Sequence, residues 1–356
     1  MKISIKLYFT FFAGTILLAC SKTDTPAPTP TTPIVTPTPT PTIKAFMPDG
    51  WKALEKFMGA ERSNTVSFAI GDKLYVGSGY ASFQGFSNVS KDFYEYDPAT
   101  NKWKAIAEFP GSSRANAIVF VIGGKAYVGL GTNYDRLTKG DLYKDFYEYD
   151  PATNKWTKKE DFTGTLRDQP IYFTIGDKGY FGTGNIDPFS PINTNEFWEF
   201  DAKTDKWTKK ASFGGAARCR AFAFAIGGKG YVGGGEDNFL KKLEDFYEYD
   251  PTSDKWARKG DFNKGLSRAV GFSIGDFGYV SGGITGLNMG GSNNYYKYES
   301  KADNWTLAGE MAAVDDTKKG RFYATCIPYK GKAYIGLGSR FIEGNNLSDF
   351  YEVVVK

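Results

Sequence analysis

A twelve-residue segment that recurs along the chain constrains the fold more than any other feature. The sequence DFYEYDPATNKW occupies residues 92–103, returns unchanged at 145–156, and returns with three changes at 245–256. Looser copies are EFWEFDAKTDKW at 196–207, NYYKYESKADNW at 294–305, and DFYEVVVK from Asp349 onward. Recurrence at a regular spacing indicates that one supersecondary unit is repeated and stacked against its own copies.

Two series of aromatic residues follow the same period of roughly 50 residues. The tyrosines of a YVG-like motif are Tyr75, Tyr127, Tyr180, Tyr231, Tyr279 and Tyr334. The tryptophans are Trp51, Trp103, Trp156, Trp207, Trp256 and Trp305. Six units therefore account for nearly all of the chain after residue 50, and we expect their aromatic residues to pack the units together.

Each unit carries the signals of four β-strands. In the first unit, the apolar run at 65–70 meets a Gly-Asp turn, whose glycine accepts the positive φ of a tight hairpin. The run LYVGSG at 74–79 is a second strand, FYEYD is a third, and the Asp-Pro-Ala-Thr-Asn turn leads into a fourth that carries the tryptophan. Four antiparallel strands in each of six units predict an all-β fold, a six-bladed β-propeller.

These motifs resemble those of the kelch-repeat family, and the resemblance covers residues 50–356. It is carried by the YVG strands, the YEYDP turns, the spaced tryptophans and a glycine four residues after each tyrosine: Gly79, Gly131, Gly184, Gly235, Gly283 and Gly338. Kelch repeats usually show adjacent glycines there, whereas this chain mostly has Gly-x-Gly. The resemblance implies a kelch-type propeller over residues 44–356.

The last unit is predicted to combine both ends of this domain. Residues 321–355 supply three strands, and the segment around Trp51 supplies the fourth. Pairing of the N- and C-terminal strands would close the ring and leave no sheet edge unpaired at the junction.

The N-terminal residues resemble a bacterial lipoprotein signal. Residues 1–19 contain two lysines and a short apolar run, and Leu17 to Cys20 resemble a lipobox with cleavage before Cys20. An ordinary signal peptide with a chance cysteine is the alternative. Residues 20–43 are rich in threonine and proline and read as a tether. In bacterial lipoproteins the residue after the lipidated cysteine sorts the protein between the two membranes, so the resemblance implies that Ser21 favours the outer membrane. We expect contact with this membrane through the lipid alone, on either its periplasmic side or the cell surface.

The sequence lacks the residue types that several kinds of catalytic and metal site require. There is no histidine, which argues against a Ser-His-Asp triad, histidine-ligated metals and the copper site of galactose oxidase. Cys219 and Cys326 fall in repeats that are not neighbours, so we expect free buried thiols and no thiolate metal cluster. We expect no metal or other cofactor. The formal net charge of +4 gives no electrostatic case for nucleic acid.

Two further series lie before the repeat tyrosines and give candidate ligand contacts. Five arginines stand thirteen residues before them: Arg62, Arg114, Arg167, Arg218 and Arg321. Their regular register favours a structural role that ties neighbouring blades together, with ligand contact as the alternative, which we keep for Arg218. Eleven residues before the tyrosines stand Asn64, Asn116, Gln169, Arg220, Arg268 and Tyr323. All six can form hydrogen bonds, so we predict a polar cup at the channel mouth that suits an anionic ligand, or else a solvated rim.

The sequence leaves two functions open. The first prediction is a non-catalytic module that binds a glycan or protein through one loop face, helped by aromatic residues of the variable loops: Phe83, Phe86, Tyr134, Phe189, Phe239 and Phe341. The alternative is an enzyme similar to sialic-acid mutarotases, which occur among bacterial six-bladed kelch propellers. For that reading Arg220 or Arg268 would hold the sugar's carboxylate. The candidates for proton transfer are Glu61, Asp168, Glu236 and Asp237.

Overall fold

A computed structural model of the chain describes residues 48–83, 86–133, 140–187, 189–286, 291–312, 320–341 and 344–355. The predicted signal, Cys20 and the tether lie outside these residues. All regular structure in the described residues is β-strand, and no helix there is long and apolar enough to cross a membrane.

Six four-stranded antiparallel sheets make up most of the described residues, and we number them in chain order. Sheet one contains β3 (Val66–Ile70), β4 (Lys73–Gly77), β7 (Phe93–Asp97) and β8 (Lys102–Ala105); sheet two contains β9 (Ile118–Ile122), β10 (Lys125–Gly129), β11 (Phe146–Asp150) and β12 (Lys155–Lys158). Sheet three contains β13 (Ile171–Ile175), β14 (Lys178–Gly182), β17 (Phe197–Asp201) and β18 (Lys206–Lys210); sheet four contains β19 (Phe222–Ile226), β20 (Lys229–Gly233), β21 (Phe246–Asp250) and β22 (Lys255–Arg258). Sheet five contains β24 (Val270–Ile274), β25 (Phe277–Ser281), β27 (Asn294–Glu299) and β28 (Asn304–Glu310); sheet six contains β29 (Thr325–Tyr329), β30 (Lys332–Gly336), β33 (Phe350–Val353) and β1 (Trp51–Ala53).

Short strands in the connections form smaller sheets. They are β2 (Arg62–Ser63) with β5 (Tyr80–Phe83) and β6 (Phe86–Val89), β15 (Asn185–Asp187) with β16 (Ile192–Asn193), β23 (Leu266–Ser267) with β26 (Ile284–Thr285), and β31 (Ser339–Phe341) with β32 (Gly344–Asn346).

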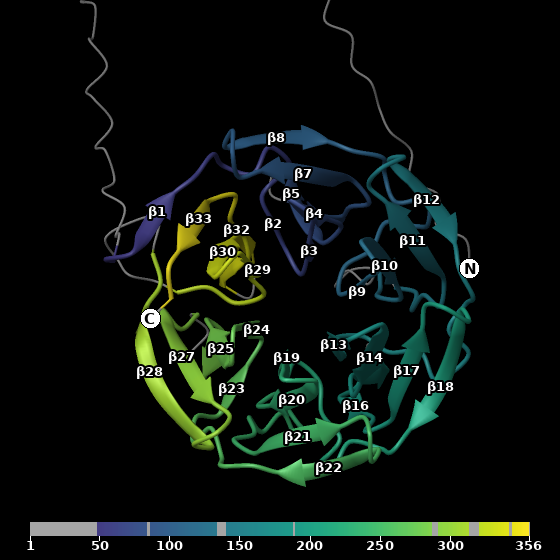
Figure 1. Cartoon of the computed structure of the whole chain (residues 1–356), viewed down its shortest axis with the longest axis vertical. Coiled ribbons are helices and arrows are strands. Elements are labelled where there is room, and N and C mark those ends of the chain that lie inside the picture. The colour runs from purple at the N-terminus through teal and green to yellow at the C-terminus, as the bar shows by residue number, and fades with distance from the viewer. Residues whose placement is uncertain are drawn as a thin grey trace, which may run out of the picture. The chain divides into compact units, whose positions relative to one another are not determined.

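The six sheets are arranged about a common centre (Figure 1). Their first strands are innermost, and each contacts the next around the centre in the order β3, β9, β13, β19, β24, β29 and back to β3. Sheet six contains strands from both ends of the domain, because β1 pairs with β33 in the register Trp51 to Val353. The predicted contribution of the Trp51 segment to the last sheet is thus confirmed.

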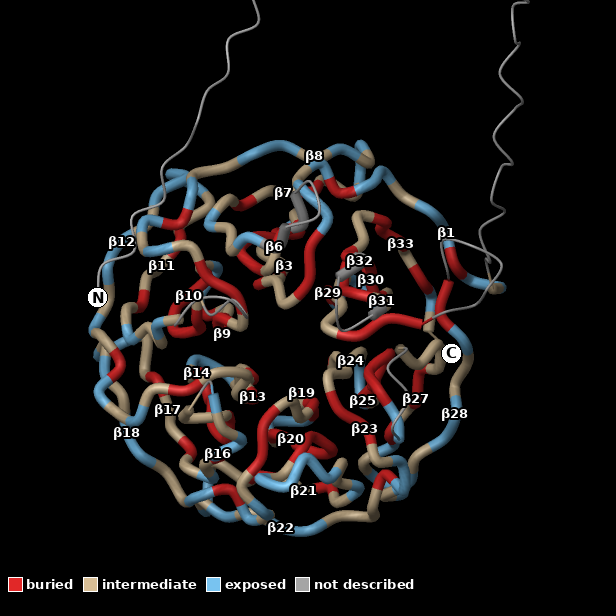
Figure 2. Tube along the Cα trace, turned by 180° about the vertical axis from the view of Figure 1, so that it is seen from behind, coloured by how far each residue is buried: buried red, intermediate tan, exposed pale blue. Residues whose placement is uncertain are grey.

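Aromatic residues fill the space between successive sheets. Trp207 of sheet three packs edge-on against Phe146 of sheet two, with ring centroids 5.0 Å apart. Trp256 packs on Phe197 at 5.0 Å in the same way. In most sheets the second strand is the most buried, as in β4, β14 and β20, whereas the outermost strands β12, β18 and β22 face solvent (Figure 2). The repeat aromatics are therefore packing residues, as predicted.

The repeat arginines anchor the connections, but their side chains bond differently from the prediction. Arg114 donates to Asp145 at 2.7 and 2.8 Å and to the carbonyl of Leu130 at 2.9 Å, all at the same end of sheet two. The side chain thus stays within its own sheet, because Asp145 immediately precedes β11, the third strand of that sheet. Neighbouring sheets are linked by the arginine backbone instead, since its carbonyl accepts from Gly79 of sheet one at 2.8 Å.

Only glycine fits where Gly79 makes this bond. Its φ is +99°, and a Cβ there would lie 2.5 Å from the carbonyl oxygen of Ser63. The same bond recurs between Gly338 of sheet six and the carbonyl of Arg62 before sheet one, at 2.9 Å. The same type of backbone hydrogen bond therefore joins sheet one to sheet two and joins sheet six, near the C-terminus, to sheet one.

Candidate functional site

The six residues of the predicted cup occupy equivalent backbone positions, each just before an innermost strand. All six have positive φ, from 51° at Tyr323 to 60° at Arg268. Asparagine tolerates this left-handed conformation, but glutamine, arginine and tyrosine adopt it at a cost that the surrounding structure must offset. Four such residues at one place point to a functional site.

Backbone hydrogen bonds connect these six residues to one another. The amide of Arg268 donates to the carbonyl of Arg220, and the amide of Tyr323 to that of Arg268, each at 2.9 Å. The amide of Asn64 donates to the carbonyl of Tyr323 at 3.3 Å, which connects the last repeat to the first. This series of bonds fixes the backbone, so the six side chains differ in chemistry but share one geometry.

A cavity of about 230 Å³ lies at this ring of residues. All six cup residues line it, together with small residues of the innermost strands such as Ser67, Ala223 and Gly271. Tyr172 of β13 is the one large side chain among the equivalent strand positions, which are otherwise Ser67, Val119, Ala223, Gly271 and Cys326. The volume is close to the lower end of small-molecule sites, which start at roughly 300 Å³. The cavity therefore suits a ligand of monosaccharide size.

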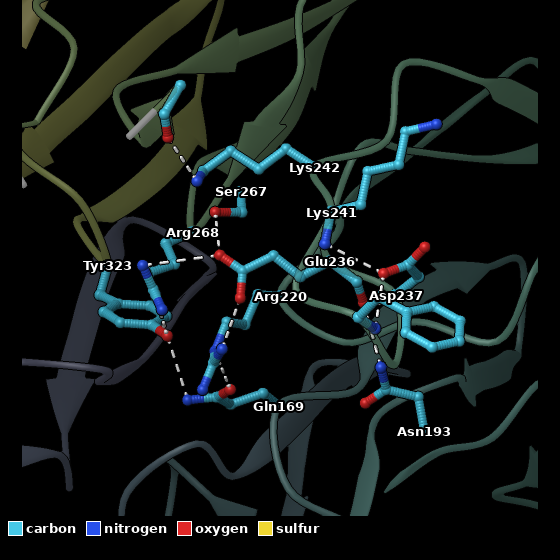
Figure 3. A network of polar contacts seen from close by, with 12 residues as sticks. Gln169, Asn193, Arg220, Glu236, Asp237, Lys241, Lys242, Ser267, Arg268 and Tyr323 are labelled. Carbon is cyan, nitrogen blue, oxygen red and sulfur yellow. Dashed lines mark hydrogen bonds and ion pairs between the residues drawn. The ribbon is translucent and has the colours of Figure 1, made fainter. Parts of the chain in front are cut away.

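Arg220 and Arg268 are held by one buried acid, Glu236 (Figure 3). Nη1 of Arg220 lies 2.5 Å from Oε2 of Glu236, and Nη1 of Arg268 lies 3.6 Å from Oε1, which also accepts from Ser267 at 2.7 Å. Burial alone would raise the pKa of Glu236, but the two arginines and Ser267 outweigh it and lower the pKa. Glu236 is thus ionised at neutral pH, and the two guanidiniums and Glu236 together carry one net positive charge, which Asp168 near Arg220 offsets when it is ionised.

Gln169 and Tyr323 bind the same two arginines on the cavity side of this cluster. Nε of Arg220 donates to Oε1 of Gln169 at 2.6 Å, and Nε of Arg268 donates to the Tyr323 hydroxyl at 3.1 Å. Nε2 of Gln169 donates to the same hydroxyl at 3.0 Å. Among the described residues, no acceptor is found for Nη2 of Arg220 or of Arg268.

A second polar chain runs through sheets one to three. Nδ2 of Asn64 donates to Asn116 at 2.6 Å, and Nδ2 of Asn116 donates to Oδ1 of Asp168 at 2.8 Å. Burial raises the pKa of Asp168 to about 6, although Asn116, Arg220 and the backbone of Gln169 oppose the shift. Asp168 can therefore gain and lose a proton near neutral pH.

Other predicted site residues lie elsewhere. Arg218 is fully buried and donates to Asp245 at 2.7 Å through each of two nitrogens, so it is a structural residue of sheet four and does not line the cavity. Glu61 is exposed and does not line the cavity. Asp237 accepts from the backbone of Phe239 and Lys241 and orders its own loop.

Glu236 was predicted from the sequence as one candidate for proton transfer, but its ion pairs with the arginines were missed. A signal for that role was present, since the residue after each repeat glycine is acidic only at Glu236; the others are Tyr80, Thr132, Asn185, Ile284 and Ser339. Ser267 was not predicted. Of the loop aromatics, Phe189 and Phe239 are exposed. Tyr134 and the side chains of Phe83, Phe86 and Phe341 lie outside what the structure describes.

Two remaining predictions concern the cysteines and possible metal sites. Cys219 and Cys326 are both buried and free. In the residues that the structure describes, no group of three or more Cys, Asp or Glu side chains is placed to hold a metal ion.

Comparisons with known proteins identify the repeat. The family model described as "Kelch motif" matches residues 61–110. An N-acetylneuraminate epimerase of Pasteurella multocida is 39% identical over 89 residues, which are 25% of this chain and 22% of that protein. The N-acetylneuraminate epimerase of Escherichia coli strain K12 is 26% identical over 200 residues, 45% of this chain and 52% of that protein. The matches thus span from about a fifth to about half of these relatives' length.

A solved structure titled "Structure of YjhT" shares the fold. It superposes with a TM-score of 0.71 over 83% of this chain and 95% of that one, at 18% sequence identity.

These relatives correct the first functional prediction. They carry the name of an epimerase, an enzyme acting on an acidic sugar, which contradicts the prediction of a non-catalytic binding module and supports the alternative.

Proposed function

Since this chain is a kelch-repeat protein, we propose that it is an enzyme of the N-acetylneuraminate epimerase type that interconverts the anomers of an acidic sugar. Its six sheets are the blades of a six-bladed β-propeller, closed by the pairing of β1 with β33. The substrate occupies the central cavity.

The observation that carries the proposal is the pair of arginines in the cavity wall. The cavity has room for one monosaccharide, and Arg220 and Arg268 share a single buried acid between them. The net positive charge and the two Nη2 groups are suited to a carboxylate, which guanidinium binds through charge-assisted hydrogen bonds. When Asp168 is protonated, a neutral sugar would leave that charge uncompensated in a partly buried place.

Anomer exchange requires proton transfers and the reversible opening of one C–O bond. The anomeric hydroxyl loses a proton while the ring oxygen gains one, the C–O bond opens, and the open-chain sugar rotates and closes on the other face. Asp168 is the candidate for these transfers, because its pKa of about 6 lets it hold either state. Asp168 does not itself line the cavity, but its carboxylate accepts from Nδ2 of Asn116, which does, so we expect Asp168 to reach the sugar through a bridging water. Glu236 is unsuited, since its arginine partners keep it ionised.

We propose further that the protein is attached to the bacterial outer membrane through lipid at Cys20. Residues 20–43 then hold the propeller away from the bilayer.

The test is NMR of N-acetylneuraminate, in which exchange between anomers is followed with and without the protein. Wild-type protein should accelerate exchange. Arg220→Ala should weaken binding by about 1.5–3 kcal/mol, the value of a hydrogen bond to a charged group. The control is Arg258→Ala, because Arg258 of the outer strand β22 is exposed and, in the part of the chain that the structure describes, forms an ion pair with Asp261 alone. A folded wild-type protein that leaves the exchange rate at its spontaneous value would refute the proposal.

A further inference from the structure

One hydrogen bond at the cavity joins opposite sides of the ring of sheets. Gln169 precedes β13 of sheet three, and Tyr323 precedes β29 of sheet six. In the order of contacts between innermost strands, two sheets separate these on either side. Nevertheless Nε2 of Gln169 lies 3.0 Å from the Tyr323 hydroxyl. The bond therefore crosses the cavity from wall to wall, and we call it the Gln169–Tyr323 bridge.

The bridge is specific to this one pair. The ring has two other opposed pairs, Asn64 with Arg220 and Asn116 with Arg268. Among the described residues, no side-chain hydrogen bond joins either of them. The crossing is thus not a general consequence of the repeat geometry.

The arginines fix the bridge in place. Because Nε of Arg220 needs an acceptor, Oε1 of the Gln169 amide faces it and Nε2 faces Tyr323. The Tyr323 hydroxyl accepts a second bond from Nε of Arg268. Together with Glu236, these side chains form a closed circuit, as Figure 3 shows.

This circuit gives both Nε groups neutral acceptors at the place where an anionic ligand would bind. A carboxylate forms stronger, charge-assisted hydrogen bonds with guanidinium than an amide or a phenol does. Each of its two oxygens can accept from Nε–H and the neighbouring Nη2–H of one guanidinium, and the released Gln169 and Tyr323 side chains then no longer span the cavity. Binding and opening are in this way coupled.

We propose that the Gln169–Tyr323 bridge closes the cavity when it is empty, and that a carboxylate ligand opens it by replacing Gln169 and Tyr323 as the acceptors of Arg220 and Arg268. Only the identity of the ligand, an acidic sugar, rests on the proposed function; the bridge does not.

The first test needs no ligand. Cys326 lines the cavity and is buried, so its thiol reports access to the interior. The full chain is treated with methyl methanethiosulfonate, a small neutral reagent, and modification of Cys326 is timed by peptide mass spectrometry. Gln169→Ala and Tyr323→Phe should each speed modification by about fivefold, because the net ~1 kcal/mol of one hydrogen bond corresponds to that factor.

The control is Asn64→Ala, which removes a side chain from the same ring without touching the bridge. The Asn64 variant should label at nearly the wild-type rate. Unchanged labelling in both bridge variants, or equal acceleration in Asn64→Ala, would overturn the proposal.

The second test uses N-acetylneuraminate and separates this inference from the proposed function. If the ligand must displace the bridge, Tyr323→Phe should bind it about fivefold more tightly, since one competing acceptor is gone. If Gln169 and Tyr323 instead hold the ligand, both variants should bind more weakly, which contradicts the exchange. Absence of binding in every variant would refute the proposed function, while the thiol measurement would still decide the bridge.

Discussion

Replacement of Arg114 tests the claim that the repeat arginines are structural and not ligand contacts. Arg114→Ala removes a guanidinium that is 1% exposed, forms two bonds to Asp145 and two to backbone carbonyls, and lies 4.5 Å from the ring of Phe109. Loss of one partner from a buried ion pair costs about 3–5 kcal/mol, because the other charge stays behind. Asp145 retains 21% exposure, so we expect the lower end, about 3 kcal/mol.

The fifth repeat supplies the matched control. There, Leu266 stands at the arginine position and Asn294 at the position of the acid, and Leu266 is 1% exposed. The double variant Arg114→Leu with Asp145→Asn copies this arrangement into sheet two. Replacing a buried ion pair by packed neutral residues is often nearly neutral in stability, so the double variant should regain most of the loss.

Urea denaturation followed by tryptophan fluorescence measures both free energies of unfolding, and titration with N-acetylneuraminate checks that affinity is kept. Two outcomes would refute the reasoning: an Arg114→Ala protein as stable as wild type, or a double variant less stable than Arg114→Ala.

Two further predictions concern Asp168 and the N-terminus. The pKa of Asp168 is raised from its usual 3.8 to about 6. Between these two pH values the native state therefore holds a proton that the unfolded chain has released, so the contribution of Asp168 to the free energy of unfolding falls as the pH rises from about 4 to 6. At about 1.4 kcal/mol per pKa unit, Asp168→Asn should raise the free energy of unfolding by up to roughly 3 kcal/mol at pH 8 and by little at pH 4, measured by urea denaturation; an equal gain at both would contradict the assignment. Cys20→Ser should abolish lipid labelling with radioactive palmitate and release the protein from membranes on fractionation; a variant still found in the membrane fraction would exclude the lipid anchor.

The sequence predicted the sheets well because the repeat displays them six times. Alternating apolar residues, a glycine turn and the Asp-Pro-Ala-Thr-Asn turn each favour their local structure for a physical reason, so the strands assigned in one unit can be assigned in all six. The positions of Asn64 and its five counterparts were equally predictable, since register within a repeat carries over to the fold. Their left-handed backbone was not anticipated, because residues such as Arg220 and Tyr323 seldom adopt it.

Contacts between repeats were harder to predict than contacts within them. The arginine series was expected to bind neighbouring sheets through its side chains, yet the backbone carbonyl does so, a group that every residue carries. The bond between Gln169 and Tyr323 joins residues 154 positions apart, and no spacing rule indicates it. It depends on the order in which the innermost strands contact one another, which places those of sheets three and six on opposite sides of one cavity.

The side chains that we propose to be functional are those in which one repeat departs from the others. Asp168 stands where the other repeats have Ser63, Ala115, Cys219, Ser267 and Phe322. Glu236 likewise has no acidic counterpart. Neither acid is needed to build a sheet, since the other sheets form without one, and both occupy partly or fully buried places where a charge is costly. The residues that all units share are enough to build a repeat fold. A buried charged residue that only one unit carries is therefore best explained by ligand binding or catalysis at the cavity.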